Sequence, residues 1–203
     1  MTDRNDRFWR RAAKNRSSGG ASFYREQRHE LLNDLSGTVL EIGPGSGPNF
    51  GYLPSGITWV GLEPNPYLHE RLRTAEYGSV LCGDAESIPL ADGSVDAVVG
   101  TIVLCSIDAQ SRVLSEVIRV LRPGGRFVFL EHVGAERGTW SRWAQQVVTP
   151  FSRRFDGGCD ATRDTGRSIE NAGFARVEMA RFVMRGPLGV NIPHVLGQAT
   201  TKR

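Results

Sequence analysis

The sequence predicts an α/β fold in which helices cover both faces of a largely parallel sheet. Short apolar runs of strand length alternate with amphipathic stretches of helical period. Glycine stands at alternate positions, Gly43, Gly45 and Gly47, after the first apolar run, so that loop can bring its backbone close to a ligand. An acidic residue, Glu63, follows the end of the next apolar run. Strands separated by helices favour a parallel sheet wound on both faces.

Composition limits the class of protein. The chain has 203 residues, of which 39% are hydrophobic and 23% charged, which suits one globular domain with an N-terminal extension. The net charge of +3 is too small to indicate a nucleic-acid partner by itself. Residues 1–30 carry a net +4, which leaves −1 for the remainder. We interpret this basic segment as a solvated helix, and a weak contact with an anionic surface is the alternative.

Cysteine usage and hydropathy indicate a compartment. Cys82, Cys105 and Cys159 have no metal-ligand spacing, so we expect reduced thiols and no metal. No apolar run reaches the ~18 residues that a membrane-spanning helix needs, and the N-terminus is charged rather than signal-like. The sequence therefore predicts a cytoplasmic protein without a stable membrane anchor, either a monomer or a homodimer.

The N-terminal third is predicted to hold two helices and three strands. A helix over residues 3–16 is followed by a Ser-Gly breaker, and a second helix begins near Ser22 as its N-cap. We assign residues 1–36 to a helical lid or extension and residues 37–203 to the main domain. A further helix begins after Pro66, a residue favoured in the first helical turn. The strands are expected at 38–42, 58–62 and 79–81.

The rest of the chain continues the alternation. Asp92-Gly93 forms a turn before a strand at 95–99. Asp108 is a suitable cap for a helix whose apolar residues run from Val113 to Leu121, and Pro123-Gly124-Gly125 ends it. The remaining elements are expected as a strand at 126–131, helices at 139–150 and 162–172, and late strands at 175–183 and 195–201.

The glycine loop differs from a dinucleotide-binding fingerprint. The third glycine of G-x-G-x-x-G would fall at position 48, which is Pro48. Glu41, at the entrance to the loop, would repel a pyrophosphate and suit a cationic ligand. Glu63 follows Gly43 by 20 residues, the spacing of a carboxylate that binds two ribose hydroxyls. Asp84 follows the third strand, where an acid can accept a hydrogen bond from the amine of adenine.

Five segments in order carry a resemblance: Glu41–Gly47, Glu63-Pro64-Asn65-Pro66, Gly83-Asp84-Ala85-Glu86, Asp92–Asp96 and Val120–Gly125. This set resembles the class I S-adenosylmethionine-dependent methyltransferases. The resemblance implies a Rossmann-like sheet of seven strands with the last one antiparallel, S-adenosylmethionine as methyl donor and S-adenosylhomocysteine as product. The residues expected to bind this cofactor are Glu41, Gly43, Pro44, Gly45, Gly47, Asn49, Glu63, Pro64, Asp84, Ala85, Glu86, Thr101 and Val103.

A finer resemblance covers most of residues 39–199. The segments that carry it are Thr101–Ile107, Glu131-His132-Val133, Trp143 with Gln145–Val147, Asp156–Cys159, Thr162-Arg163 and Pro193-His194. They are similar to the small alkyl thiol S-methyltransferases, which implies a small-molecule thiol acceptor and direct in-line transfer. The animal members have an apolar N-terminal anchor where this chain has a charged segment, so membrane attachment is not carried over.

Three residues are candidate catalytic groups. A thiol is a few per cent thiolate at neutral pH, and an imidazole or carboxylate nearby could raise that fraction. The candidates are His132 at the end of a strand, Asp156 and His194; structural roles for all three stay open. Direct transfer needs no covalent intermediate, so Cys105 and Cys159 are interpreted as structural.

Other residues border the expected site. Trp140 and Trp143 either line an apolar acceptor pocket or pack their helix on the sheet, and Phe23 and Tyr24 are candidates for a lid over the cofactor.

Other functions remain open at this point. A small-molecule O-, N- or C-methyltransferase of a natural-product pathway would share the same core. A binding module that no longer catalyses is a third interpretation, although the intact glycines and acids argue against it. The sequence lacks the Asn-Pro-Pro-Tyr/Phe-type tetrapeptide expected of a nucleic-acid methyltransferase, so we expect no nucleic-acid substrate.

Overall fold

The computed structural model describes residues 10, 24–73, 78–155, 157–186 and 189–203. The predicted helix over 3–16, its Ser-Gly breaker and Ser22 lie almost wholly outside this part, as do Phe23 and Asp156. Its elements are α2 (Arg25–Leu32), β1 (Thr38–Ile42), η1 (Phe50–Tyr52), β2 (Thr58–Leu62), α3 (Pro66–Arg73), β3 (Gly78–Leu81), β4 (Val95–Thr101), η2 (Leu104–Ser106), α4 (Gln110–Val120), β5 (Leu121–His132), α5 (Trp140–Phe155), α6 (Thr165–Glu170), β6 (Arg176–Arg185) and β7 (Asn191–Thr200).

Seven strands form one sheet in the order β3-β2-β1-β4-β5-β7-β6. The five strands from β3 to β5 pair in parallel, and β7 is antiparallel to both β5 and β6. This confirms the predicted sheet and its antiparallel last strand. The strand order reverses between β1 and β4, and ligands bind such sheets at the carboxyl ends of the strands beside that reversal.

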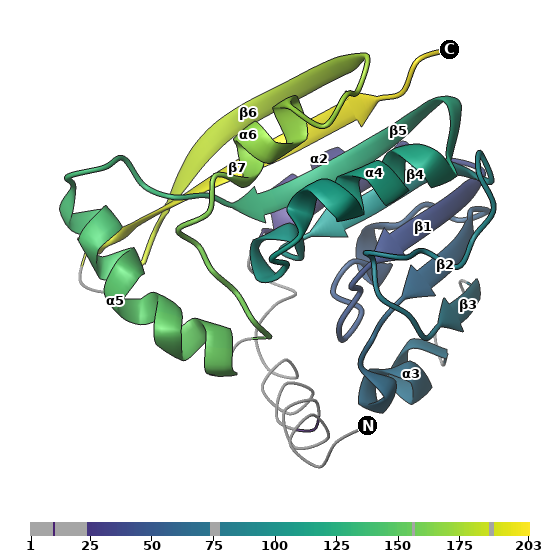
Figure 1. The fold of residues 1–203 in the computed structure, drawn as a ribbon. Helices are drawn as coiled ribbons and strands as arrows, with labels where there is room; N and C mark the ends of the chain where they lie inside the picture. Colours follow the sequence, from purple (N-terminus) through teal and green to yellow (C-terminus); the bar gives the residue numbers. More distant parts are fainter. Residues whose placement is uncertain (1–9, 11–23, 74–77, 156, 187–188) are drawn as a thin grey trace.

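Helices cover both faces of the sheet (Figure 1). Leu114 and Val117 of α4 and Ile169 of α6 are fully buried on one face. On the other face, Leu32 of α2 and Leu72 of α3 pack around Trp59 of the sheet, which is also fully buried. The described part of the predicted N-terminal extension thus packs directly on the sheet, while the boundary at residues 36 and 37 stays a prediction.

Several predicted element ends differ from the structure. Asp108 does not cap α4, because Ala109 occupies the N-cap position without a side-chain hydrogen bond. The helix expected over 162–172 is shorter, and it begins after Asp164, whose side chain accepts from the backbone N–H of Arg167. Competing bonds explain the first difference, since the Asp108 carboxylate accepts from Arg153 and Arg163 instead.

Three other ends extend beyond the predictions. The strand expected at 126–131 begins already at Leu121, with a register shift between Val95 and Ala97 on its neighbour β4. Helix α5 continues past Pro150 to Phe155, and β7 begins at Asn191 rather than at 195.

Candidate functional site

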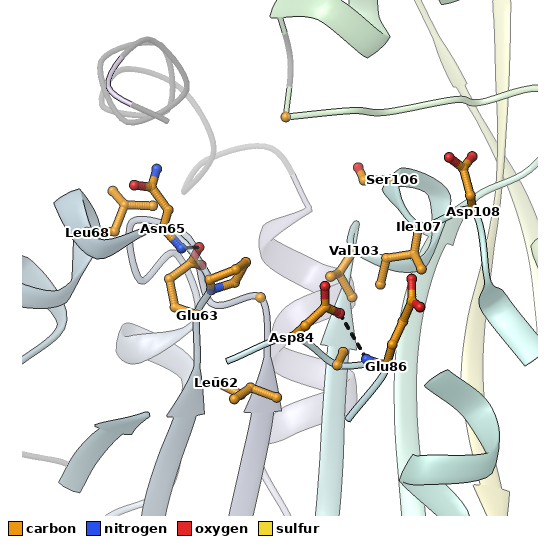
Figure 2. A pocket seen from close by; sticks show the side chains of 14 residues that line it. Leu62, Glu63, Asn65, Leu68, Asp84, Glu86, Val103, Ser106, Ile107 and Asp108 are labelled. Atoms are coloured by element: carbon orange, nitrogen blue, oxygen red, sulfur yellow. Dashed lines mark hydrogen bonds between the residues drawn. The ribbon is translucent and has the colours of Figure 1, made fainter. Parts of the chain in front are cut away.

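A cavity of about 300 Å³ lies at the carboxyl ends of the central strands, at the reversal in strand order (Figure 2). Its walls come from the loops after β1, β2, β3 and β4, together with one glycine of the segment after α5. The lining residues are Gly43, Leu62, Glu63, Pro64, Asn65, Leu68, Asp84, Ala85, Glu86, Val103, Ser106, Ile107, Asp108 and Gly157.

The loop after β1 needs its glycines for backbone geometry. Gly43, Gly45 and Gly47 all have positive φ angles, of 61°, 59° and 79°. A Cβ at Gly43 would stand 2.5 Å from Cγ2 of Val103 on the opposite wall of the cavity. A side chain there would therefore close the space between the two loops.

Glu63 ties the end of β2 to the glycine loop. Its carboxylate accepts hydrogen bonds from the backbone N–H groups of Gly45 and Asn65, each at 2.9 Å, and its side chain borders the cavity (Figure 2). Each carboxylate oxygen has a second lone pair, so this group can also accept from two hydroxyls of a ligand. Glu63 is only 4% exposed, which fixes its orientation toward the cavity.

The loop after β3 presents a second acid to the cavity. The Asp84 carboxylate accepts from the backbone N–H of Glu86 at 2.9 Å, which holds a tight turn at this position (Figure 2). Its other oxygen is available to a donor such as an amine. Asp84 and Glu63 thus lie on neighbouring strand ends, as their positions in the sequence predict.

The structure places Glu41 behind the glycine loop and outside the lining of the cavity. Its carboxylate accepts from Trp59 Nε1 and Asn49 Nδ2, each at 2.8 Å, and Asn49 also donates to the Thr101 hydroxyl at 2.9 Å. Glu41 is not among the lining residues, and its contact with a cationic ligand at the loop entrance stays a prediction. Burial raises the pKa of Glu41 to about 7, while its hydrogen bonds and Arg28 oppose that shift.

The predicted cofactor residues divide into two groups. Those that line the cavity are Gly43, Glu63, Pro64, Asp84, Ala85, Glu86 and Val103. Those that do not are Glu41, Pro44, Gly45, Gly47, Asn49 and Thr101. In the second group, Gly45 donates to Glu63, and Asn49 joins Glu41 to Thr101. All of them stay predictions as cofactor contacts.

Sequence reasoning missed several lining residues. Asn65 lies in the turn after Glu63 and Leu68 in α3, while Ser106 ends η2 and Ile107 and Asp108 follow it. The signal for Ser106 and Ile107 was present in the Thr101–Ile107 segment of the finer resemblance.

Glu131 positions the loop between β4 and α4. Its fully buried carboxylate accepts from the backbone N–H groups of Val103, Leu104 and Cys105 at 2.9, 2.8 and 3.1 Å. Burial raises the pKa of Glu131 to about 7, and these three bonds oppose the shift. Ile102 at the start of the loop has a positive φ of 53°, a costly conformation for a β-branched residue. The carboxylate holds the strained loop against the cavity.

The predicted catalytic histidines lie together beyond this loop. The Tyr24 hydroxyl is 2.8 Å from Nε2 of His194 and 3.2 Å from Nε2 of His132. On its other side, Nδ1 of His132 lies 3.6 Å from Sγ of Cys105 and 3.4 Å from Sγ of Cys159. Asp156 lies outside the described residues, so its predicted role stays a prediction.

His194 is held as a neutral imidazole. Burial, and then the neighbouring His132, lower its pKa to about 4. Because a carbonyl oxygen only accepts, Nδ1 of His194 must donate to the Ile192 carbonyl, which lies 2.8 Å away. The Nε2 atom of the neutral ring then accepts from Tyr24. Tyr24 thus links the two histidines, and its role as a lid stays a prediction.

The tryptophans of α5 are exposed. Trp140 and Trp143 are 58% and 53% exposed and stack on each other with ring centroids 4.8 Å apart. Neither lines the cavity, and Trp143 instead borders a shallower hollow with Arg137 and Arg142. Their exposure does not fit the expected packing of the helix on the sheet, and a role in an acceptor pocket stays a prediction.

The chain matches a family of known proteins. A family model described as "Methyltransferase domain" matches residues 40–129, which contain the glycine loop, Glu63 and Asp84. Human thiol S-methyltransferase TMT1A is 38% identical over 172 residues, covering 80% of this chain and 70% of that protein. Human thiol S-methyltransferase TMT1B is 37% identical over 192 residues, covering 85% and 78%. The chain is a class I S-adenosylmethionine-dependent methyltransferase.

Solved structures support the fold of the methyltransferase. A methyltransferase from Thermotoga maritima superposes with a TM-score of 0.69 at 19% identity, covering 96% of this chain and all of that one. The [4+2]-cyclase SpnF superposes with a TM-score of 0.67 at 18% identity, covering 87% and 79%. The second match shows that the fold alone does not define the reaction.

The cavity of the methyltransferase fits S-adenosylmethionine. Gly43 leaves open the space that a Cβ would fill, and the buried Glu63 carboxylate retains acceptor capacity toward it. Asp84, which also lines the cavity, is a second acidic group on this wall, and its contact with the adenine amine stays a prediction. Within the described residues, no helix is long and apolar enough to cross a bilayer.

Proposed function

We propose that the methyltransferase transfers a methyl group to the thiol of a small, apolar molecule. The observation that carries this proposal is the extent of the likeness to the thiol S-methyltransferases. That likeness spans 80 to 85% of the chain, whereas the donor-binding family model covers only residues 40–129. It therefore includes much of the part from which class I enzymes build their acceptor side.

The residues of the donor cavity bind and orient S-adenosylmethionine. Glu63 accepts from ribose hydroxyls, Asp84 accepts from the adenine amine, and the glycine loop admits the backbone close to the ligand. S-adenosylmethionine supplies an electrophilic methyl group on a sulfonium when it is bound. Because displacement at carbon is in line, the protein must align the acceptor sulfur with that group.

Apolar residues and an imidazole near the cavity support a thiol acceptor. Val103 and Ile107 give the cavity an apolar side, and the loop that carries them continues to Cys105 and its neighbour His132. A general base that accepts the thiol proton raises the thiolate fraction, and His132 is our candidate for that base. Natural-product thiols, antibiotic dithiols and xenobiotic thiols are the acceptors that we propose.

The setting of the reaction also belongs to this proposal. We place it in the cytoplasm, with a monomeric or homodimeric enzyme, no stable membrane anchor and no nucleic-acid partner.

An acceptor panel tests the proposal. The purified protein is incubated with S-adenosylmethionine and matched pairs of small apolar thiols, phenols and amines, and products are identified by mass spectrometry. We expect S-methyl products from the thiols and none from the corresponding phenols and amines. Turnover of phenols or amines alone would instead make it an O- or N-methyltransferase, and donor binding without any turnover would indicate a binding module.

A further inference from the structure

We propose that Cys105, His132 and Cys159 form a zinc site, whose fourth position takes the acceptor thiol. The three side chains offer Sγ, Nδ1 and Sγ atoms that all lie within 4.8 Å of one another. They come from η2, from the end of β5 and from the segment after α5. The zinc site stands on this geometry alone, while the role of its fourth position rests on the proposed function.

The distances match a tetrahedral zinc ion. Zinc lies about 2.3 Å from sulfur and about 2.0–2.1 Å from nitrogen, which places two sulfurs about 3.8 Å apart and sulfur about 3.6 Å from nitrogen. In the structure the Sγ atoms of Cys105 and Cys159 are 3.6 Å apart. Nδ1 of His132 is 3.6 and 3.4 Å from them. All three separations therefore fit a common metal ion.

A chain of hydrogen bonds directs the correct nitrogen of His132 at the thiols. His194 accepts from the Tyr24 hydroxyl at 2.8 Å, so the proton of that hydroxyl is used. The Tyr24 oxygen must then accept at 3.2 Å from Nε2–H of His132. In a neutral ring with its proton on Nε2, the lone pair is on Nδ1, between the sulfurs. Such a partner on the far nitrogen is typical of metal-binding histidines.

Burial and charge are compatible with a zinc ion at this place. Cys105 is fully buried and Cys159 is 6% exposed. Two thiolates in such a place would be strongly disfavoured without a cation, whereas zinc with two thiolates and a neutral imidazole carries no net charge.

The number of ligands indicates which kind of zinc site this is. Among the residues that the structure describes, no fourth cysteine, histidine or acid joins the cluster. Structural zinc sites generally have four protein ligands, and catalytic sites have three with one open position.

The site also lies next to the cavity. Ser106, adjacent to Cys105, and Gly157, two residues before Cys159, both line it. The backbone N–H of Asp160 donates to the Cys105 carbonyl at 3.0 Å and joins the two segments. Two of the three ligands therefore belong to segments that also form the cavity wall.

The reaction at this position balances. The thiol loses its proton to water as its sulfur binds zinc, so zinc replaces His132 as the group that raises the thiolate fraction, and His132 is a ligand rather than a base. A lone pair of that sulfur forms the new bond to the methyl carbon, and the carbon–sulfonium bond breaks with its electrons on the sulfonium sulfur. The products are a methyl thioether, S-adenosylhomocysteine and the released proton.

Metal content tests the site without any variant. The full chain is produced with zinc in the medium, and its metals are measured by inductively coupled plasma mass spectrometry and zinc X-ray absorption. We expect one zinc per chain with two sulfur neighbours and at least one nitrogen. The zinc site would be overturned if the protein remained zinc-free after reconstitution and Cys105 and Cys159 were found unreactive toward thiol reagents or joined in a disulfide.

Variants then locate the ion. Cys105→Ser and Cys159→Ser should each lower zinc content at least tenfold, and Cys82→Ser, an exposed cysteine outside the cluster, should retain it. Circular dichroism and S-adenosylhomocysteine binding check that each variant is folded. Folded Cys105→Ser and Cys159→Ser proteins that both keep full zinc would refute the assignment.

The role of the fourth position is tested separately. Adding a small thiol should bring a third sulfur into the zinc X-ray absorption spectrum. A thiol that is methylated equally by zinc-free protein would refute this role and leave the proposed function standing. If zinc is bound at the site but only phenols are methylated, the zinc site stands and the proposed thiol methylation is refuted.

Discussion

At the scale of single residues, the structure separates acids that face the ligand cavity from acids that support it. Glu63 borders the cavity and joins it to the glycine loop, while Glu41, expected beside it, is enclosed by Asn49 and Trp59. Both acids follow apolar strands, so their sequence contexts are alike. The tertiary partners alone distinguish their roles.

The Glu63 carboxylate should be required for donor binding. Glu63→Gln preserves the shape but removes the charge that accepts from ligand hydroxyls, a change of about 1.5–3 kcal/mol, or roughly 10- to 100-fold in affinity. Isothermal titration with S-adenosylhomocysteine measures it. Glu70→Gln, on the exposed side of α3, is the control and should bind like the parent. Equal binding by both variants would show that Glu63 does not contact the ligand.

His194 should make stability depend on pH. Its folded pKa of about 4 lies below the ordinary 6.5, so the neutral form is favoured by folding. That contribution, on the order of 2–3 kcal/mol at most, is complete above pH 6.5 and is lost as pH falls toward 4. Urea unfolding measures the free energy of unfolding of the parent and of His194→Asn between pH 7 and 5. We expect the stability of the parent relative to His194→Asn to decrease as the pH falls.

Two acids change stability with pH in the opposite direction, but their effect is the same in the parent and in His194→Asn. The pKa values of Glu41 and Glu131 are raised to about 7, so they lower stability as pH rises from about 4.5 to 7. Both proteins contain them, so they do not affect the difference. A difference that is constant with pH would contradict the assignment of His194 as neutral.

At the scale of elements, loops at strand ends form the site, and the strands place them. Strands 38–42 and 58–62 have the predicted bounds, because each is a compact apolar run between turn residues. Helix α4 and the start of β5 were less predictable. Asp108 is drawn to two arginines, and pairing with β4 extends β5 back through Pro123-Gly124-Gly125.

The glycine loop should not tolerate a side chain at its first glycine. In Gly43→Ala the Cβ meets Val103 at 2.5 Å and the φ of 61° is strained. We expect at least about tenfold weaker S-adenosylhomocysteine binding and a loss of about 1–2 kcal/mol in stability. Calorimetric titration and urea unfolding measure the two effects.

Gly51→Ala is the matched control for this substitution. No atom lies within 4 Å of its added Cβ, so it should change neither property. Normal ligand binding by Gly43→Ala would show that the loop and Val103 do not define the cavity.

At the scale of the whole molecule, ligand binding should stabilise the folded protein. A ligand at about 100 times its dissociation constant adds about 2.7 kcal/mol, which for a chain of this size raises Tm by roughly 5–10 °C. Differential scanning fluorimetry with S-adenosylhomocysteine measures the shift, and Glu63→Gln should show a smaller one at the same concentration. An unchanged Tm in the parent would contradict binding to the folded state.

The sequence by itself determined the fold class, the identity of the methyl donor and half of the residues that line the cavity. These features depend on local patterns: apolar runs, glycines with positive φ, and acids at fixed distances after strands. Such patterns act within a few residues, and a parallel sheet then brings successive strand ends to one edge.

Only the tertiary structure decided which polar groups meet across the chain. Cys105, His132 and Cys159 are separated by 27 residues or more, and their spacing suggested no metal. They meet because the ends of β4 and β5 are neighbours in the sheet and because the segment after α5 bonds to the Cys105 carbonyl. Contacts of this kind depend on which strands and loops become neighbours in the folded chain. The spacing of residues along the sequence does not determine that.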